Sequence, residues 1–259
     1  MKAQVILTPR DLSPESLVYR AVVVFDVLRA TTTITAALAA GVSEIRIFDS
    51  IDAATVAARS FQGRRILCGE RNCLPPSGFD LGNSPCAFNA ASHAGLTAFL
   101  CTTNGTRAIV AARTAGAIFA GALVNATSVA QQLAQSNLDI TLLCAGTDGE
   151  PAPEDILGAG AVLDALAKVL KFECDAATEN ALNLFQESRG DLRSALAATP
   201  GGRNIVSAGL PDDIDFAAQL DAIPVVGRIL PNPLRIIRAA PVPSPGTPGE
   251  GKDEGDFER

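Results

Sequence analysis

The stretch that most constrains this chain is residues 22–33, VVVFDVLRATTT, in which an apolar, β-branched run ends in one carboxylate, one guanidinium and a cluster of threonines. The unbroken apolar run has the length of a strand that is buried on both faces, as in a parallel sheet covered by helices. The alanine-rich segment 34–40 has helical spacing, and Gly41 follows where a helix would end. This order of elements is typical of an α/β fold.

The rest of the chain repeats the alternation of strands and helices, without a convincing internal sequence repeat. The alternation predicts a three-layer α/β/α fold around a mostly parallel, possibly mixed, sheet. Residues 200–210 give no clear signal. Strands are predicted at 4–7, 44–48, 65–68, 97–102, 117–120, 140–144, 225–230 and 234–238, and helices at 51–61, 108–113, 126–135, 154–171, 176–198 with a break near Gly190, and 214–220.

Composition and charge exclude several classes of protein. The net charge of −7 argues against general nucleic-acid binding and against attachment to an anionic membrane. Met1 is not followed by a basic region and a long apolar run, and no apolar stretch reaches membrane-spanning length. The six cysteines are scattered without a CxxC pair, which favours reduced thiols over a disulfide framework. We therefore expect a cytoplasmic protein with one α/β domain over residues 1–238 and a disordered, Pro/Gly-rich, charged tail over 239–259.

Polar clusters follow three of the predicted strands, at 26–33, 102–107 and 145–155. The carboxyl ends of strands in an open parallel sheet lie along one edge, so these clusters are expected to converge in one crevice. Asp26, Arg29 and Thr31 come from the first cluster. An alternative is that Asp26 only caps the following helix and that Arg29 only pairs with it.

The segment Thr103-Asn104-Gly105-Thr106, which lies directly before a predicted helix, has the features of an anion-binding turn. Glycine allows the backbone to approach an anion closely, and the first N–H groups of the helix point toward it. Arg107 and Arg29 could each bind a phosphate or a sulfonate through two parallel hydrogen bonds. A plain type I′ turn at Asn104-Gly105 is the alternative for this tetrapeptide.

A long loop without regular structure is predicted at residues 69–85, GERNCLPPSGFDLGNSP, because it contains three prolines and three glycines. It carries Glu70, Arg71, Asp80, Asn83 and Ser84, which favours a functional role. Mg²⁺ prefers oxygen ligands, and it is usually bound by one or two carboxylates together with phosphate and water. The carboxylates that could hold such a cation are more than one ion requires, so some are helix caps; they are Asp26, Glu70, Asp80, Glu154 and Asp155.

Two phosphatase signatures match only in part. Cys101 and Arg107 have the spacing used by cysteine phosphatases, but Leu100 stands where those enzymes have a histidine. Asp26 is similar to an aspartyl nucleophile of the haloacid-dehalogenase type, but Leu28 stands where a second aspartate is needed. His93 is the only histidine, so a catalytic triad or a histidine-based metal site is not expected.

Four motifs occur in order along the chain: DVLRATTTI at 26–34, GER at 69–71 with GFDLGNSP at 78–85, TTNGTR at 102–107, and CAGT at 144–147 with Glu154-Asp155. With these motifs the chain resembles the 2-phosphosulfolactate phosphatase family, Mg²⁺-dependent hydrolases linked to coenzyme M biosynthesis and sulfolactate metabolism. The resemblance covers roughly residues 4–230, and it departs from the family at residues 72–76, NCLPP, where small residues are usual.

The resemblance implies an α/β/α homodimer that hydrolyses (2R)-phospho-3-sulfolactate to 3-sulfolactate and phosphate. Mg²⁺ would be held by Asp26 with help from Glu70, Asp80 or Asp155. Arg29, Arg107 and the amides of residues 103–106 would stabilise charge on the phosphoryl group, and Thr31 is a further substrate-binding candidate. Arg71, Asn83 and Ser84 would hold the sulfonate or the carboxylate of the substrate. Whether water or Asp26 attacks phosphorus stays open, as do two alternatives: a phosphatase acting on another small anionic ester, and a non-catalytic anion-binding protein.

Overall fold

The apolar run forms strand β2 (Arg20–Phe25) inside a ten-stranded sheet in the computed structural model, which describes residues 1–242. Side chains alternate across the sheet. Val22 and Val24 therefore pack into one apolar cluster, while Val23 and Phe25 pack into another on the opposite face. Both faces are covered by helices, which gives the three-layer α/β/α architecture predicted from the sequence.

The element bounds follow the predicted pattern closely. The other strands are β1 (Lys2–Ile6), β3 (Glu44–Phe48), β4 (Arg65–Gly69), β5 (Thr97–Cys101), β6 (Ala117–Gly121), β7 (Asp139–Cys144), β8 (Glu173–Cys174), β9 (Gly227–Pro231) and β10 (Leu234–Arg238). The helices are α1 (Ala30–Ala39), α2 (Ile51–Ser60), α3 (Ala90–His93), α4 (Gly105–Ala111), α5 (Ala126–Ser136), α6 (Pro153–Leu166), α7 (Ala176–Ser188), α8 (Leu192–Ala198), α9 (Pro200–Ser207) and α10 (Pro211–Ala217).

A few elements differ from the sequence prediction. The unclear stretch 200–210 forms α9, and the strand β8 was not predicted. The helix predicted over 154–171 ends at Leu166. The predicted break near Gly190 is confirmed, because the short 3-10 helix Arg189–Asp191 separates α7 from α8.

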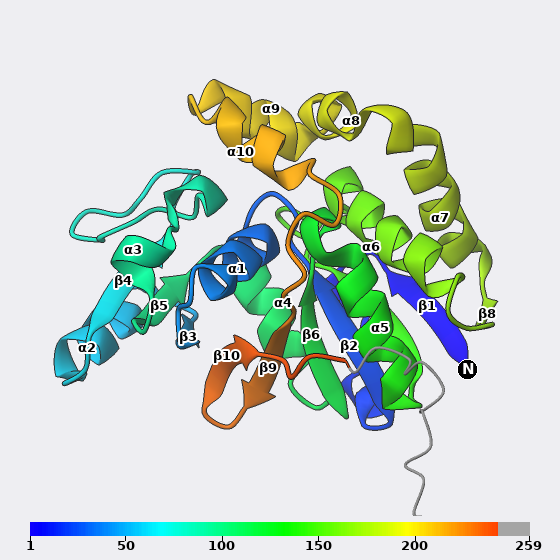
Figure 1. The fold of residues 1–259 in the computed structure, drawn as a ribbon, viewed down its shortest axis with the longest axis horizontal. Helices are drawn as coiled ribbons and strands as arrows, with labels where there is room; N and C mark the ends of the chain where they lie inside the picture. The colour runs from blue at the N-terminus through cyan, green and yellow to red at the C-terminus, as the bar shows by residue number, and fades with distance from the viewer. Residues whose placement is uncertain (243–259) are drawn as a thin grey trace, which may run out of the picture.

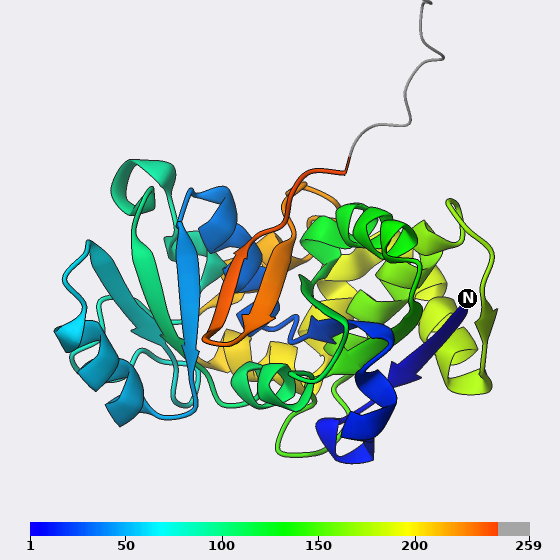
Figure 2. The ribbon, with the colours of Figure 1, turned by 90° about the horizontal axis from the view of Figure 1, so that it is seen from below.

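The sheet contains two parallel sets of strands with an antiparallel hairpin between them. Its order is β4-β5-β3-β10-β9-β6-β2-β7-β1-β8. Strands β3, β4 and β5 are parallel to one another, as are β1, β2, β6, β7 and β8. The β9–β10 hairpin, drawn in orange in Figure 2, joins the two sets through antiparallel pairs on both of its sides.

This topology corrects the expectation that the polar clusters lie along one edge of a parallel sheet. Three antiparallel pairings separate β3 from β6, so the β3–β5 set runs opposite to the β2 set along the sheet. Adjacent strands twist by about 20 to 25° each, which accumulates to about 100 to 125° over the five steps from β5 to β2. The turn after β5 lies against the turn after β2, since a Cβ atom on Gly105 would lie 2.8 Å from Asp26 Oδ2. The two sets of strands therefore share one site.

The helices divide between the two faces of the sheet. One apolar cluster joins β1, β2 and β7 to α5, α6 and α7 and to the following helices α8, α9 and α10. The opposite cluster joins β2 and the β3–β5 set to α1 and α4, while α2 covers the outer face of β4 and β5. Figure 1 shows α9 and α10, drawn in gold and orange, close to the start of α1.

The chain stays attached to the domain just beyond the predicted boundary at residue 238. The Ala239 N–H donates to the Val226 carbonyl at 2.8 Å, and Gln132 Nε2 donates to the Ala240 carbonyl at 2.6 Å. Residues 243–259, which make up most of the predicted disordered tail, lie outside the described residues. Among the helices of residues 1–242, none combines the length and the apolar character needed to span a membrane.

Candidate active site

Asp26 stands directly after β2, where the strand gives way to the turn that leads into α1. Its Oδ1 atom accepts a hydrogen bond from the Ala30 amide at 3.0 Å, so Asp26 does cap α1, as the alternative interpretation held. Its other oxygen faces the start of α4, where a Cβ atom on Gly105 would lie 2.8 Å from Oδ2. Glycine is therefore required at position 105 for α4 to approach this carboxylate.

The electrostatic environment of Asp26 is unusual for a carboxylate. Burial raises the pKa of Asp26 to about 6, and the nearby charges of Glu70 and Glu154 add to the rise. Amide hydrogen bonds from Ala30 and Gly105 oppose it. A desolvated carboxylate among other carboxylates is stabilised by a bound cation, because the cation offsets both the desolvation and the repulsion.

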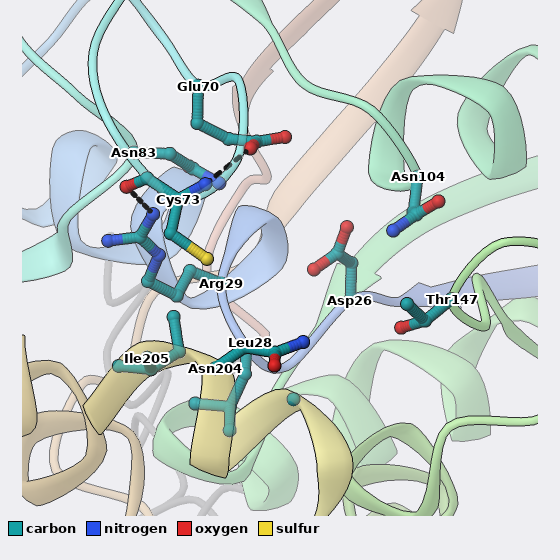
Figure 3. A pocket seen from close by; sticks show the side chains of 11 residues that line it. Asp26, Leu28, Arg29, Glu70, Cys73, Asn83, Asn104, Thr147, Asn204 and Ile205 are labelled. Carbon is teal, nitrogen blue, oxygen red and sulfur yellow. Dashed lines mark hydrogen bonds between the residues drawn. The ribbon is translucent and has the colours of Figure 1, made fainter. Parts of the chain in front are cut away.

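Asp26 lies near the middle of a small cavity of about 90 Å³, which we call the inner cavity. Figure 3 shows Asn104 and Thr147 on one side of Asp26, and Arg29, Glu70, Cys73 and Asn83 on the other. Asn83 is buried, and its Oδ1 atom has no hydrogen-bond partner within residues 1–242. The remaining lining residues are Leu28, which is joined to Arg29 by a cis peptide bond, and Gly201, Asn204 and Ile205 from α9.

Arg29 is held in place by two contacts on the wall of the inner cavity. Its Nη1 atom donates to Asp213 Oδ2 at 2.7 Å, and its Nη2 atom donates to the Cys73 carbonyl at 2.6 Å. The residue is only 4% exposed. The alternative that Arg29 pairs with Asp26 is therefore wrong, because its ionic partner is Asp213 of α10.

Glu70 forms the boundary between the inner cavity and a larger, open cleft. Its Oε1 atom accepts from the amide and the hydroxyl of Thr103, at 2.9 and 2.7 Å, and its Oε2 atom accepts from the Cys73 amide at 3.2 Å. The larger cleft, of about 650 Å³, we call the outer cleft. Besides Glu70 it is lined by Asp49, Ser50, Ile51, Asp52, Arg71, Asn72, Cys101, Thr102, Thr103, Thr106 and Arg107.

The turn at residues 102–107 divides its side chains between the two spaces. Asn104 has a right-handed helical backbone, with φ −103° and ψ −49°, so the type I′ turn is wrong and α4 begins at Gly105. Asn104 lines the inner cavity, whereas Thr103, Thr106 and Arg107 line the outer cleft. The Thr106 hydroxyl is buried and accepts from the Thr102 amide at 3.2 Å.

Further predicted residues, Glu154 and Asp155 among them, line neither the inner cavity nor the outer cleft. Thr31 is buried, and its hydroxyl is hydrogen bonded to the backbone of Asp26. Both carboxylate oxygens of Asp155 accept from backbone amides, those of Val27 and Gly146, at 2.8 and 3.0 Å. Asp155 thus ties the turn after β2 to the turn after β7.

Asp80 and Ser84 also line neither space. Asp80 is exposed, and its carboxylate accepts a hydrogen bond from the Leu67 amide of β4 at 2.8 Å. Ser84 donates to Asp213 Oδ1 at 2.5 Å, so it supports the wall of the inner cavity without lining it. Of the predicted carboxylates, only Asp26 and Glu70 line the inner cavity. Asp155 lies outside it, where burial raises the pKa of Asp155 and the charge of Asp26 is close enough to raise it further.

Neither cysteine nor histidine chemistry fits this site. Cys101 is the last residue of β5, and burial raises the pKa of its thiol, which is opposite to what an activated thiolate requires. His93 is buried and packs against Phe88, with ring centroids 5.4 Å apart. Within residues 1–242, no group of three or more His, Cys, Asp and Glu side chains is arranged to hold a metal ion.

Sequence reasoning missed the contribution of the helices after residue 198. Gly201 and Asn204 line the inner cavity, and Asp213 holds Arg29. The helix starts had a signal in the pairs Thr199-Pro200 and Leu210-Pro211, because proline is favoured in the first turn of a helix. No sequence signal placed these helices beside Asp26, since that proximity depends on tertiary packing.

Comparison with known proteins identifies the family to which this chain is similar. The sequence model of the family described as 2-phosphosulpholactate phosphatase matches residues 6–230. The chain belongs to this family. A probable 2-phosphosulfolactate phosphatase of Carboxydothermus hydrogenoformans is 37% identical over 227 residues, which cover 87% of this chain and 92% of that protein. One from Deinococcus radiodurans is 37% identical over 223 residues, covering 85% and 92%.

Membership of the 2-phosphosulfolactate phosphatase family extends over both the inner cavity and the outer cleft. Every lining residue of the two spaces falls between positions 26 and 205, inside the matched range. Asp213 also falls inside it. The family assignment made from the four sequence motifs is therefore confirmed.

Proposed function

We propose that this chain is a Mg²⁺-dependent phosphatase that converts (2R)-phospho-3-sulfolactate and water to 3-sulfolactate and phosphate. The observation that carries the proposal is the inner cavity, where the Asp26 carboxylate and the Arg29 guanidinium face one small space. The names of the relatives support the choice of substrate. An oxygen donor for a cation and a guanidinium for an anion are the two groups that phosphoryl transfer requires.

The oxygen atoms around the inner cavity fit a magnesium ion. Asp26 and Glu70 supply carboxylates, and the buried Asn83 Oδ1 is an acceptor without a partner in the described part of the chain. A hard cation of this kind is usually bound by one or two carboxylates, with water and substrate phosphate completing the shell. When bound, Mg²⁺ would neutralise phosphoryl oxygens and lower the pKa of a water molecule.

The sizes of the two spaces suggest how the substrate lies. The inner cavity, at about 90 Å³, is the smaller of the two spaces and is lined by Asp26 and Arg29, so we place the phosphoryl group there. The outer cleft, at about 650 Å³, carries Arg71 and Arg107, whose side chains form no ion pair within residues 1–242. We therefore place the sulfonate and the carboxylate beside these two arginines, so that Arg107 binds the distal part of the substrate instead of the phosphoryl group.

The test is phosphate release by the purified full chain from phosphosulfolactate, phospholactate and phosphoglycolate, each with Mg²⁺ and with EDTA. We expect metal-dependent release that is fastest from phosphosulfolactate and is abolished by Asp26→Asn. The matched control is Asp52→Asn, an exposed carboxylate of the outer cleft that the proposal does not use as a metal ligand.

Three other results of the phosphate-release assay would change the proposal. Faster release from another ester would keep the chemistry and replace the substrate. Release that persists in EDTA would overturn the role of the metal. Anion binding without phosphate release from any ester would favour a non-catalytic anion-binding protein.

We also propose that the chain acts as a homodimer, as the family resemblance implies. Light scattering of the purified protein would test this directly. A mass close to twice the 26.7 kDa of the chain is expected, and a mass of one chain at micromolar concentration would overturn it.

A further inference from the structure

The guanidinium of Arg29 is fixed by a residue far away in the sequence. Arg29 and Asp213 are 184 positions apart, yet Nη1 and Oδ2 lie 2.7 Å from each other. Their side chains are 3% and 2% exposed, so the ion pair is almost completely removed from solvent. Asp213 lies in the first turn of α10, and α10 therefore reaches the wall of the inner cavity through this contact.

Asp213 is itself held by a second contact. Its Oδ1 atom accepts a hydrogen bond from Ser84 Oγ at 2.5 Å, so each carboxylate oxygen has one partner. Ser84 follows Asn83, a lining residue of the inner cavity whose buried Oδ1 atom has no hydrogen-bond partner in the described part of the chain. One buried carboxylate thus connects the turn after β2, the loop before α3 and helix α10.

From this arrangement we infer that Asp213 is a positioning residue for the phosphatase reaction, which fixes the guanidinium of Arg29 toward the inner cavity. This inference rests on the proposed function. A guanidinium has five N–H donors, and the contacts with Asp213 and the Cys73 carbonyl use two of them. Three donors remain on a group that cannot rotate without breaking a buried ion pair.

A fixed guanidinium matters more for the transition state than for substrate binding. A flexible arginine can follow a ground-state anion, but stabilisation of developing charge requires donors that are already in position. Asp213 also offsets part of the charge of Arg29. Its removal therefore makes the inner cavity more positive while it loosens the guanidinium, and these two changes act in opposite directions on ground-state affinity.

The test is Asp213→Asn in the full chain, with Asp212→Asn as the matched control. Asp212 precedes it in α10, but its side chain is exposed and makes no ion pair in the described part of the chain. We expect Asp213→Asn to lower kcat about 10- to 100-fold and to change KM less than threefold, whereas Asp212→Asn changes neither.

A double-mutant cycle with Arg29→Lys separates positioning from a general structural effect. If Asp213 acts through Arg29, Asp213→Asn causes little further loss of kcat in the Arg29→Lys background. Equal losses in both backgrounds would overturn the inference. If Asp213→Asn does not fold, Ser84→Ala replaces it in the cycle, because it removes one support of Asp213 and leaves the ion pair in place; there we expect a loss of about threefold to tenfold.

A spectroscopic measurement keeps this inference distinct from the proposed function. The Arg29 guanidinium should give resolved Nη–H signals in ¹⁵N NMR spectra of the wild-type protein, because its rotation is restricted, and averaged signals in Asp213→Asn. If no ester is hydrolysed, the proposed function fails, and these spectra still test whether Asp213 fixes Arg29. Averaged signals in the wild-type protein would overturn the inference whatever the activity.

Discussion

The inner cavity and the outer cleft meet at Glu70, yet they hold their charged side chains in opposite ways. In the inner cavity, Asp26 and Arg29 are less than one tenth exposed, and each has at least one hydrogen-bond partner. In the outer cleft, Arg71 and Arg107 are exposed, and neither forms an ion pair within the described residues.

The difference indicates a division of labour. A buried charge is strongly coupled to its surroundings, because few water molecules screen it, and its position is fixed by the contacts that compensate for its desolvation. An exposed arginine is mobile and is screened by salt. The inner cavity therefore suits a chemical step that requires fixed donors, and the outer cleft suits the capture of a charged substrate.

The largest expected effect comes from Arg29→Ala. It should lower kcat by a factor of about 10² to 10³, because it removes a fixed donor from the phosphoryl site. It should also lower the free energy of unfolding by about 3 to 5 kcal/mol, because Asp213 is left buried without its cation. Steady-state kinetics and urea unfolding measure the two effects. The matched change Arg107→Ala should leave the free energy of unfolding within about 0.5 kcal/mol, and equal destabilisation by both would contradict the comparison.

The next effect is a gain in stability that depends on pH, and it is expected for Asp26→Asn. The pKa of Asp26 is about 6 in the folded protein and 3.8 as its ordinary value, so the folded state binds this proton more tightly. The resulting stability is fully present below pH 3.8 and is lost as the pH rises through 6. In EDTA, the free energy of unfolding of Asp26→Asn should therefore exceed that of the wild type by up to about 3 kcal/mol at pH 7.5. Below pH 3.8 the two proteins should be equally stable. A difference that does not depend on pH would show that Asp26 is not held in this environment.

Glu70→Gln tests the boundary between the two spaces. The carboxylate accepts three hydrogen bonds, from Thr103 and Cys73, and an amide can replace only part of them. We expect the free energy of unfolding to fall by about 1 to 2 kcal/mol. The Mg²⁺ concentration at half-maximal rate should rise about tenfold, because the proposed metal site loses one carboxylate. An unchanged Mg²⁺ dependence would remove Glu70 from the proposed metal site and leave it as a structural link.

The smallest effect on stability is expected in the outer cleft. Arg71→Gln and Arg107→Gln should each raise KM for phosphosulfolactate about tenfold, a loss of about 1.4 kcal/mol in binding, with kcat nearly unchanged and no shift in Tm. Each change should also flatten the dependence of KM on ionic strength. A loss of kcat without a change in KM would place these arginines at the phosphoryl group instead.

The sequence predicted the elements well because local patterns specify them. The packing of residues 22–25 on alternate faces of the sheet follows from an apolar run between two helical layers. A helix was also predicted next to the Thr103–Thr106 segment, although α4 begins inside that segment at Gly105. The sequence offered five carboxylates as possible metal ligands, with Asp26 and Glu70 among them. Local sequence patterns could not show which of the five line the same cavity. Asp26 follows a buried strand and Asp155 lies in the first turn of α6. Only the structure shows that both oxygens of Asp155 accept hydrogen bonds from backbone amides.

By itself, then, the sequence determined the α/β architecture, the family and the set of polar residues from which a site could be built. The tertiary structure decided which of them share a space. Gly105 lies against Asp26, although their strands belong to oppositely directed sets that the β9–β10 hairpin separates. The packing of α10 gives Arg29 its partner in Asp213, 184 residues later. Such contacts depend on how elements that are distant in the sequence pack in three dimensions, and a local pattern of residues does not specify that packing.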